Sequence, residues 1–368
     1  MKLSKKKVFT LALSVCMLAI LSLGSLAWFT DQDAVTNDFL IAGSENGDPD
    51  DIFSVDVWEE GDDEDDGRVY TDILPGDTLD KVVHVENTGS YDQYIRVKIV
   101  VSQAAVWQDV YDANMVPVTE FVNVDLDKVY GVGSYLEGDN FVYYLYYNDI
   151  LPVEENFVVF TEAYIDGELT IEQAALMKDG FQITVTADAV QTENVGDNVY
   201  EAFKTVGMEI EVNTVWVNNK AELIEAFAND GYIVLNADIK HDELQSVSSN
   251  VNLYLNDHML RAVRKNDMAS WTLTGDLTIG GHGTFVLPGD YGIYVNGTLS
   301  IFGGTYLDDY DRPSCDDEAL FNVYEKGVLN IYNGTFAGAE YCANVRNGNG
   351  VANIWGGTYT ATIESIKY

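Results

Sequence analysis

The first half of the chain alternates apolar and polar positions with a period of two residues, the pattern of strands that bury one face. One such stripe consists of Ile95, Val97, Ile99 and Val101. Further strands are expected at 141–147 and at 181–190, the second of which alternates cleanly. Two short helices interrupt the strands, one at 171–179 behind Thr170 as its cap and one at 199–206. This all-β pattern predicts an antiparallel β-sandwich with short helices over residues 28–213.

A different pattern begins near residue 215. Residues 220–229 (KAELIEAFAN) have apolar side chains at helical spacing, and a strand is expected at 232–235. Four copies of one template then begin at residues 275, 297, 327 and 350, so the intervals are 22, 30 and 23 residues. The template is Gly-x-Leu-x-Ile-x-x-Gly-Thr followed by Phe or Tyr, with Ala352 replacing Leu in the last copy and one extra residue in the first.

Repeats of this length, with strands of four or five residues, are typical of coils in a parallel β-helix. Stacking the copies predicts two inward ladders, which consist of Leu299, Leu329 and Ala352, and of Ile279, Ile301, Ile331 and Ile354. We expect the helix at 220–229 to cover the open end of the first coil. The sequence therefore predicts a β-helix with an N-terminal capping helix over residues 214–368.

The N-terminal segment sets the expected compartment. Four lysines within the first seven residues precede an apolar run at 8–26 that ends in small residues. This pattern predicts a secretory signal peptide over residues 1–27, with signal-peptidase cleavage between Ala27 and Trp28. An uncleaved membrane anchor is the alternative. With cleavage, we expect a secreted protein of the extracellular matrix or cell surface that has no stable membrane span.

Charge excludes one class of partner. The chain has 20 Lys and Arg against 60 Asp and Glu, a formal net charge of −40, which argues against nucleic acid. A hydrophobic content of 47% is sufficient for real cores, so the chain is not a disordered acidic tail. The His-Glu-x-x-His motif of zinc proteases is missing from the sequence, and no cofactor is expected.

Two candidate sites remain in the β-helix. After cleavage, Cys315 and Cys342 are the only cysteines, and outside the cell they predict one disulfide, with two buried thiols as the alternative. The second site is an acidic loop that is either a structural Ca²⁺ site or simply solvated, and it consists of Asp308, Asp309, Asp311, Asp316, Asp317 and Glu318. The acidic run at 59–66 has the same two interpretations.

Two segments resemble known families. Residues 26–43 (LAWFTDQDAVTNDFLIAG) and 74–99 (LPGDTLDKVVHVENTGSYDQYIRVKI) resemble the camelysin/TasA family, whose members are exported through the signal peptidase SipW and build biofilm fibres. The resemblance implies a jelly-roll-like sandwich and assembly by strand donation. The donor would be residues 28–43, with Val35, Phe39 and Ile41 on one face; pairing within its own domain is the alternative. Residues 215–368 resemble the pectate-lyase-like right-handed β-helix superfamily, including AELIEAFANDGYIVLNADI at 221–239.

Three functional hypotheses follow. The leading one is a structural or adhesive protein of a Gram-positive-type bacterial surface or biofilm matrix, which self-assembles or binds other matrix proteins and wall or matrix glycans. The second is a polysaccharide lyase or glycosidase. His282 in Gly-His-Gly resembles a polygalacturonase element, but the paired aspartates follow it in the chain instead of preceding it, so no catalytic residue is assigned. The third is a monomeric glycan-binding adhesin.

Overall fold

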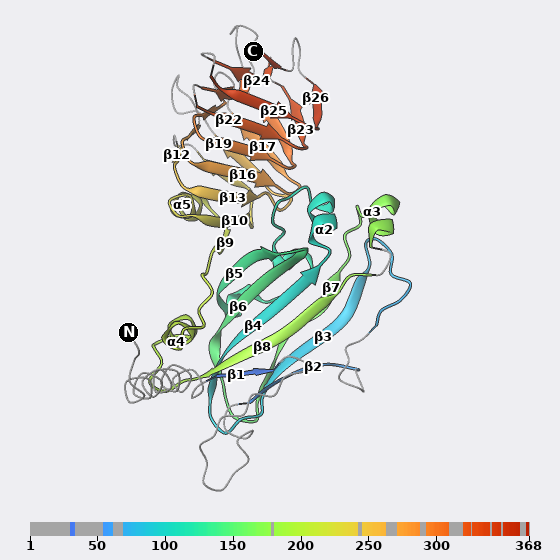
Figure 1. Ribbon diagram of the computed structural model, residues 1–368, viewed down its shortest axis with the longest axis vertical. Coiled ribbons are helices and arrows are strands. Elements are labelled where there is room, and N and C mark those ends of the chain that lie inside the picture. Colours follow the sequence, from blue (N-terminus) through green and yellow to red (C-terminus); the bar gives the residue numbers. More distant parts are fainter. Residues whose placement is uncertain are drawn as a thin grey trace, which may run out of the picture.

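The computed structural model is mostly β, with 51% strand and 12% helix, as the sequence predicts. It describes residues 30–33, 54–61, 69–177, 180–241, 245–262, 271–287, 292–308, 319–324, 326–338, 341–346, 349–360 and 366–367. An N-terminal part of antiparallel strands lies against a C-terminal solenoid, and the two parts follow one another along the longest axis (Figure 1).

The N-terminal part contains two antiparallel arrays of strands. The first array runs in the order β1 (Thr30–Asp33), β8 (Ile183–Gln191), β4 (Gln93–Ser102), β6 (Asn140–Leu151) and β5 (Val129–Glu137). The second consists of β2 (Val55–Glu59), β3 (Thr78–Asn87) and β7 (Asn156–Tyr164). A bulge interrupts the pairing of β3 with β7 between Asp80 and His84.

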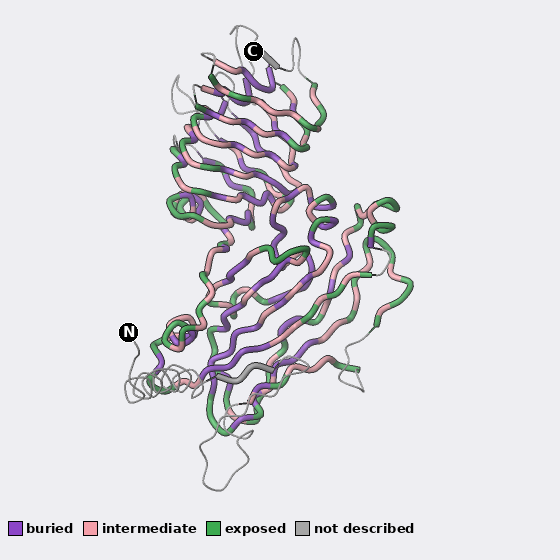
Figure 2. Tube along the Cα trace, viewed as in Figure 1, coloured by how far each residue is buried: buried purple, intermediate pink, exposed green. Residues whose placement is uncertain are grey.

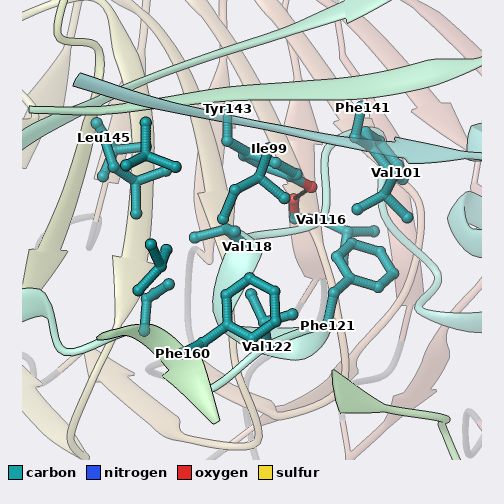
Figure 3. Close-up of a cluster of buried hydrophobic side chains, with 14 of the residues drawn as sticks. Ile99, Val101, Val116, Val118, Phe121, Val122, Phe141, Tyr143, Leu145 and Phe160 are labelled. Carbon is teal, nitrogen blue, oxygen red and sulfur yellow. Dashed lines mark hydrogen bonds between the residues drawn. The ribbon is translucent and has the colours of Figure 1, made fainter. Parts of the chain in front are cut away.

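Both arrays bury one face in a common core (Figure 3). The predicted stripe of β4 supplies four side chains that are all 0% exposed, Ile95, Val97, Ile99 and Val101. Phe141 and Tyr143 of β6 extend this face, and Phe160 of β7 approaches it from the second array. The connection after β4 fills the space between with Val116, Val118, Phe121 and Val122.

Both predicted helices of this part are present, and its described residues contain one further α-helix that was not predicted. α3 (Ile171–Leu176) begins with a capping box in which Thr170 Oγ1 accepts from Gln173 N. α4 (Val199–Thr205) begins at Asn198, which accepts from Glu201 N. α2 (Ala104–Val110) lacks a side-chain cap and was missed because its apolar residues continue the strand pattern of β4.

α4 covers a buried ion pair on the outer face of the first array. Arg96 of β4 donates from Nε to Asp188 Oδ2 of β8 over 3.0 Å, and both residues are almost fully buried. The guanidinium lies 4.5 Å from the ring centroid of Tyr144 and 4.6 Å from that of Phe203 in α4. Arg96 also donates to the carbonyl of Met208, so it ties the segment after α4 to the sheet.

The C-terminal part is a parallel β-solenoid. Each coil supplies one strand to each of three parallel sheets. The strands are β10 (Gly231–Leu235), β11 (Ile239–His241), β12 (Gln245–Val247), β13 (Asn250–Tyr254), β14 (Met259–Ala262), β15 (Trp271–Leu273), β16 (Asp276–Gly280), β17 (Thr284–Leu287), β18 (Ile293–Val295), β19 (Thr298–Ile301), β20 (Thr305–Asp308), β21 (Ala319–Val323), β22 (Val328–Ile331), β23 (Thr335–Ala337), β24 (Tyr341–Val345), β25 (Val351–Ile354), β26 (Thr358–Thr360) and β27 (Ile366–Lys367).

The predicted inward ladders are confirmed by the strand register. Leu299 pairs with Leu329 and then with Ala352, and Ile301 pairs with Ile331 and then with Ile354. A second sheet adds an inward aromatic ladder of Tyr306, Phe336 and Tyr359, whose ring centroids are 5.0 Å apart at each step. Side chains of the same kind thus stack on one another from coil to coil in these ladders.

The capping helix is also confirmed. α5 (Lys220–Ala226) begins at Asn219, whose side chain accepts from Ala221 N and Glu222 N. Its apolar face buries Leu223 completely, and Phe227 just after it is 1% exposed. Both belong to the solenoid core together with Leu235 of the first coil.

One hydrogen-bonded sheet crosses from the first part into the second. β9 (Thr214–Val217) pairs parallel with β10 of the solenoid and antiparallel with β5 through Val132 and Thr214. Asn213 fastens this step, because its side chain accepts from Ser134 N over 2.8 Å and donates to Ser134 O over 2.9 Å. Buried segments lie on both sides of the junction (Figure 2).

The buried ion pair gives a stability prediction. Arg96→Met leaves the Asp188 carboxylate buried without its partner, and we expect the free energy of unfolding to fall by about 3–5 kcal/mol in urea titrations. Lys98→Met, on the same strand, is the matched control and should cost less than about 1 kcal/mol. The double variant Arg96→Met/Asp188→Leu should recover most of the loss; equal losses in the single and double variants would show that the unpaired charge is not the cause.

Candidate functional site

The connection after α2 forms a second contact between the two parts. Asp112 O accepts from Gly281 N over 2.8 Å, and Asp112 Oδ1 accepts from Asn333 Nδ2 over 2.8 Å. Asp112 has a φ of 46°. Tyr143 holds the other end of the connection by donating to Val116 O over 2.6 Å. We call residues 111–117 the docking segment.

A glycine in the first repeat makes room for the docking segment. A Cβ on Gly280 would lie 2.8 Å from both Ala113 Cα and Asp112 O, closer than side-chain carbons come in proteins. The same template position holds Phe302, Tyr332 and Trp355 in the later copies. The deviation of the first copy therefore reflects the contact between the two parts.

The contact is tight and apolar. Val234 and Tyr254 of the solenoid belong to the core of the N-terminal part. The cavity that remains there measures about 20 Å³ and is lined by residues that include Met115, Tyr232 and Thr278. That volume is enough for about one water molecule, so the junction offers no enclosed site for a small-molecule ligand.

Carboxyl groups gather at the edge of this contact. Glu120 is largely buried, and its side chain forms a hydrogen bond with Tyr254. Burial raises the pKa of Glu120 to about 7, and the nearby charges of Asp257 and Asp166 add to the increase, while His282 opposes it. We call Glu120, Asp166 and Asp257 the junction carboxyl cluster.

Three further ionisable groups lie near the junction carboxyl cluster: His282, Tyr111 and Asp112. The Nε2 atom of His282 lies 3.6 Å from Glu168 Oε2, and its ring centroid lies 6.5 Å from that of Tyr111. Burial raises the pKa of Tyr111, and the charges of Glu120 and Asp166 raise it further. Asp112 is affected in the same direction, since burial raises the pKa of its carboxyl group.

The junction carboxyl cluster can hold a proton at neutral pH, because the pKa of Glu120 is raised to about 7.

Within the described ranges, no group of three or more His, Cys, Asp or Glu side chains has the geometry to hold a metal ion. His282 contacts Glu168 and Tyr111 instead of forming a nucleophile–base pair. Sequence reasoning missed the cluster, because its three members come from three separate segments and no local pattern connects them.

Most of the predicted site residues lie outside the described residues. They are Ala27, Trp28, Val35, Phe39, Ile41, Cys315, Asp309, Asp311, Asp316, Asp317 and Glu318. Asp308 is the last residue of β20 and pairs with Leu287. Cys342 lies in β24 at 3% exposure and forms no disulfide with another described residue, and burial raises the pKa of its thiol. The disulfide and the Ca²⁺ loop stay predictions.

The described end of the acidic run is paired with basic groups. Glu59 forms an ion pair with Lys81, and Glu60 Oε1 lies 3.0 Å from His84 Nε2. An open groove of about 450 Å³ lies beside them, and its lining includes Asp80 and Glu162. The groove is polar and open, unlike the enclosed apolar sites that hold small ligands.

Aromatic and amide ladders line the outside of the solenoid. Phe302 stacks on Tyr332 with ring centroids 4.5 Å apart, and Tyr332 stacks on Trp355 at 4.7 Å. Beside them, Asn353 Nδ2 donates to Asn330 Oδ1 over 3.0 Å, and Asn330 Nδ2 donates to Ser300 Oγ over 3.3 Å. Aligning the repeats would have revealed this aromatic position, since three of four copies carry an aromatic residue after the inward Ile.

In the described part of the chain, no helix is long and apolar enough to cross a membrane.

The junction carboxyl cluster predicts a pH effect with a definite sign. Because the pKa of Glu120 is raised from 4.5 to about 7, the folded chain holds a proton that the unfolded chain releases. Its contribution to stability is therefore complete below about pH 4.5 and is lost as the pH rises towards 7. We expect Glu120→Gln to melt like the original chain at pH 4 and several degrees higher at pH 8. Glu162→Gln is the control, and a Glu120→Gln curve parallel to that of the original chain at all pH values would contradict the assignment.

A larger residue in place of Gly280 should open the contact between the docking segment and the solenoid. Gly280→Phe would complete the aromatic ladder but push a side chain into Ala113, so the docking segment should be displaced. We expect faster proteolysis within residues 111–117 and a lower melting temperature. Tyr332→Phe keeps the ladder and serves as the control. Unchanged proteolysis of Gly280→Phe would show that the docking segment does not depend on this glycine.

Comparisons of the chain with protein-family models, with curated proteins and with solved structures gave no match.

Proposed function

We propose that the chain is a secreted structural or adhesive protein of a bacterial cell surface or biofilm matrix. Residues 28–213 would be a jelly-roll-like sandwich that mediates assembly, and residues 214–368 a right-handed β-helix that presents a surface to matrix glycans or partner proteins. The observation that carries the proposal is the sheet that continues from β5, through the pair of Val132 with Thr214 in β9, into β10. Such a connection would hold a displayed part in a fixed position on an assembling part.

Two further contacts support a rigid connection. The docking segment binds Gly281 and Asn333 on the solenoid, and Tyr254 extends the core of the N-terminal part. A buried apolar contact of this kind opposes the hinge motion that is common between domains. The solenoid is thus held at a fixed angle to the sheets that would assemble.

Assembly by strand donation has a physical basis at the sheet edge. β1 pairs antiparallel with β8 of its own chain, from Thr30 with Val190 to Asp33 with Ala187. These four pairs lie at the end of the sheet, so the same hydrogen bonds could be made by β1 of another copy. Such exchange is head to tail and does not close, so it produces filaments. The pairing of β1 with β8 of the same chain would then be the state of the monomer before assembly.

The monomeric adhesin is the second candidate. It is favoured by the pairing of β1 within its own chain and by the outward ladders of the solenoid, where Tyr332 is 42% exposed and Trp355 is 61% exposed. Aromatic rings beside amide groups suit the apolar faces and hydroxyl groups of sugars. Glycan-array binding without any polymerisation would favour this candidate, and release of reducing sugar from acidic glycans would favour the enzyme.

Cysteine cross-linking tests strand exchange directly. Asp31 and Ala189 are partners across the β1–β8 ladder. In chains that start at residue 28 and carry Cys315→Ser, we expect a mixture of Asp31→Cys and Ala189→Cys chains to form disulfide-linked dimers, because exchange places the two positions together in different copies. Asp31→Cys mixed with Ser90→Cys is the control. Cross-links in the Asp31→Cys/Ala189→Cys double variant alone, and none in the mixture, would exclude exchange.

The charge of the chain adds a prediction about conditions. Copies with a net charge of −40 repel one another, so filament formation in negative-stain images should increase with ionic strength, with Ca²⁺ and with falling pH. Chains that start at Ser44 lack β1 and should form no filaments under the same conditions. Assembly that weakens as salt is added would contradict the proposal.

A further inference from the structure

One position of the repeat template carries glycine in two copies and asparagine in another. Gly303 and Gly356 precede the Gly-Thr pair in the second and fourth copies, and Asn333 stands in their place in the third. A Cβ on Gly303 would collide with Asp112 Cβ, so this glycine leaves room for the docking segment. One coil further on, Asn333 Nδ2 donates to Asp112 Oδ1 over 2.8 Å. Asn333 thus holds the docking segment by its side chain.

The sequence Asn333-Gly334 has the chemistry that favours spontaneous deamidation. In that reaction the backbone nitrogen of the next residue attacks the side-chain carbon Cγ of the asparagine. A next residue without a Cβ neither hinders the attack nor restricts the backbone. Asn333 is exposed, so solvent reaches its side chain. Gly334 N donates no hydrogen bond to a described residue, so no such bond has to break before the attack.

A second Asn-Gly pair of the solenoid differs at the attacking nitrogen. Asn296 is exposed like Asn333 and is followed by Gly297. Gly297 N, however, donates to Leu273 O over 3.0 Å. Attack by Gly297 N therefore requires local opening of the coil, and only a fraction of the folded molecules is open at any time. The two pairs share their sequence and their exposure, and they differ in whether the attacking nitrogen is hydrogen-bonded.

We propose that Asn333 is a site of spontaneous deamidation and that this modification loosens the hold of the solenoid on the docking segment. Gly334 N loses its proton and forms a bond to Asn333 Cγ, and the Cγ–Nδ2 bond breaks with loss of ammonia. Water then opens the succinimide ring and leaves an aspartate or an isoaspartate. The reaction consumes one water molecule and involves no oxidation or reduction. Its result is a carboxylate in place of the amide that donates to Asp112.

The new carboxylate would lie beside a carboxyl group that depends on the lost donor. Burial raises the pKa of Asp112, and the hydrogen bond from Asn333 opposes this increase by stabilising the charged form. His282 also opposes the increase, whereas the charges of Asp109 and Glu168 add to it. Deamidation removes the stabilising donor and adds a like charge. The hydrogen bond that the carbonyl of Asp112 accepts from the solenoid should therefore open more often.

Peptide mapping by mass spectrometry tests the reaction on chains that start at residue 28 and are kept at pH 8 for weeks. We expect aspartate and isoaspartate to accumulate at position 333 several times faster than at position 296. In urea the two positions should react at similar rates, because the hydrogen bond of Gly297 N is then lost. Equal rates at the two positions in the folded chain, or no reaction at position 333, would overturn the proposal.

Two variants separate the added charge from the lost hydrogen bond. Asn333→Asp introduces the carboxylate, whereas Asn333→Gly only removes the donor and is expected to fold, since glycine occupies this position in two other copies. We expect the Gly281 amide, which donates to Asp112 O, to exchange with deuterium at least about tenfold faster in Asn333→Asp than in Asn333→Gly.

Asn296→Asp is the matched control, because it adds the same charge at the other Asn-Gly pair, and the Gly281 amide should exchange in it as in the original chain. Equal exchange in Asn333→Asp and Asn333→Gly would show that deamidation does not loosen the docking segment. Neither experiment involves β1, so both outcomes are independent of strand exchange.

Discussion

The arrangement of this molecule depends on how the edges of its β-sheets find hydrogen-bond partners. A strand with no neighbour exposes a row of N–H and C=O groups that must find partners or face water. The edge of β5 is joined to β9 by the pair of Val132 with Thr214, and the edge of β8 is paired with β1. The relation between the two parts follows from the first of these pairings, because the sheet that leaves the N-terminal part becomes the first sheet of the solenoid.

Local periodicity predicted the elements that repeat. The Leu and Ile ladders were readable because each coil buries the same template positions, and the capping helix was readable because Leu223 and Phe227 lie one helical turn apart on one face. The residues that connect the two parts follow no repeated pattern in the sequence. In the sequence, Gly280 is only the copy without an aromatic residue at its template position; the reason becomes visible when Ala113, far away in the sequence, is brought against it.

The sequence also did not predict which charged residues would be buried together. Arg96 and Asp188 are 92 positions apart, and nothing in either segment marks them as partners beneath α4. The same holds for Glu120, whose raised pKa depends on burial by the solenoid and on Asp257. An acidic composition indicates repulsion in general, but which carboxyl groups become neutral is decided by tertiary contacts. The chain as a whole is acidic, but at the junction the protonation of a single carboxyl group, that of Glu120, depends on its burial and on its neighbours.

The direction of the hydrogen bonds in the solenoid has a mechanical consequence. The bonds between coils run along the solenoid axis, in three sheets side by side. A force spread over the surface of a coil loads all three sheets together, whereas a force on the end of the chain breaks the bonds of one strand at a time. The protein should therefore resist traction on its side far better than traction on its terminus, and a load attached to the terminus would unravel it one coil after another.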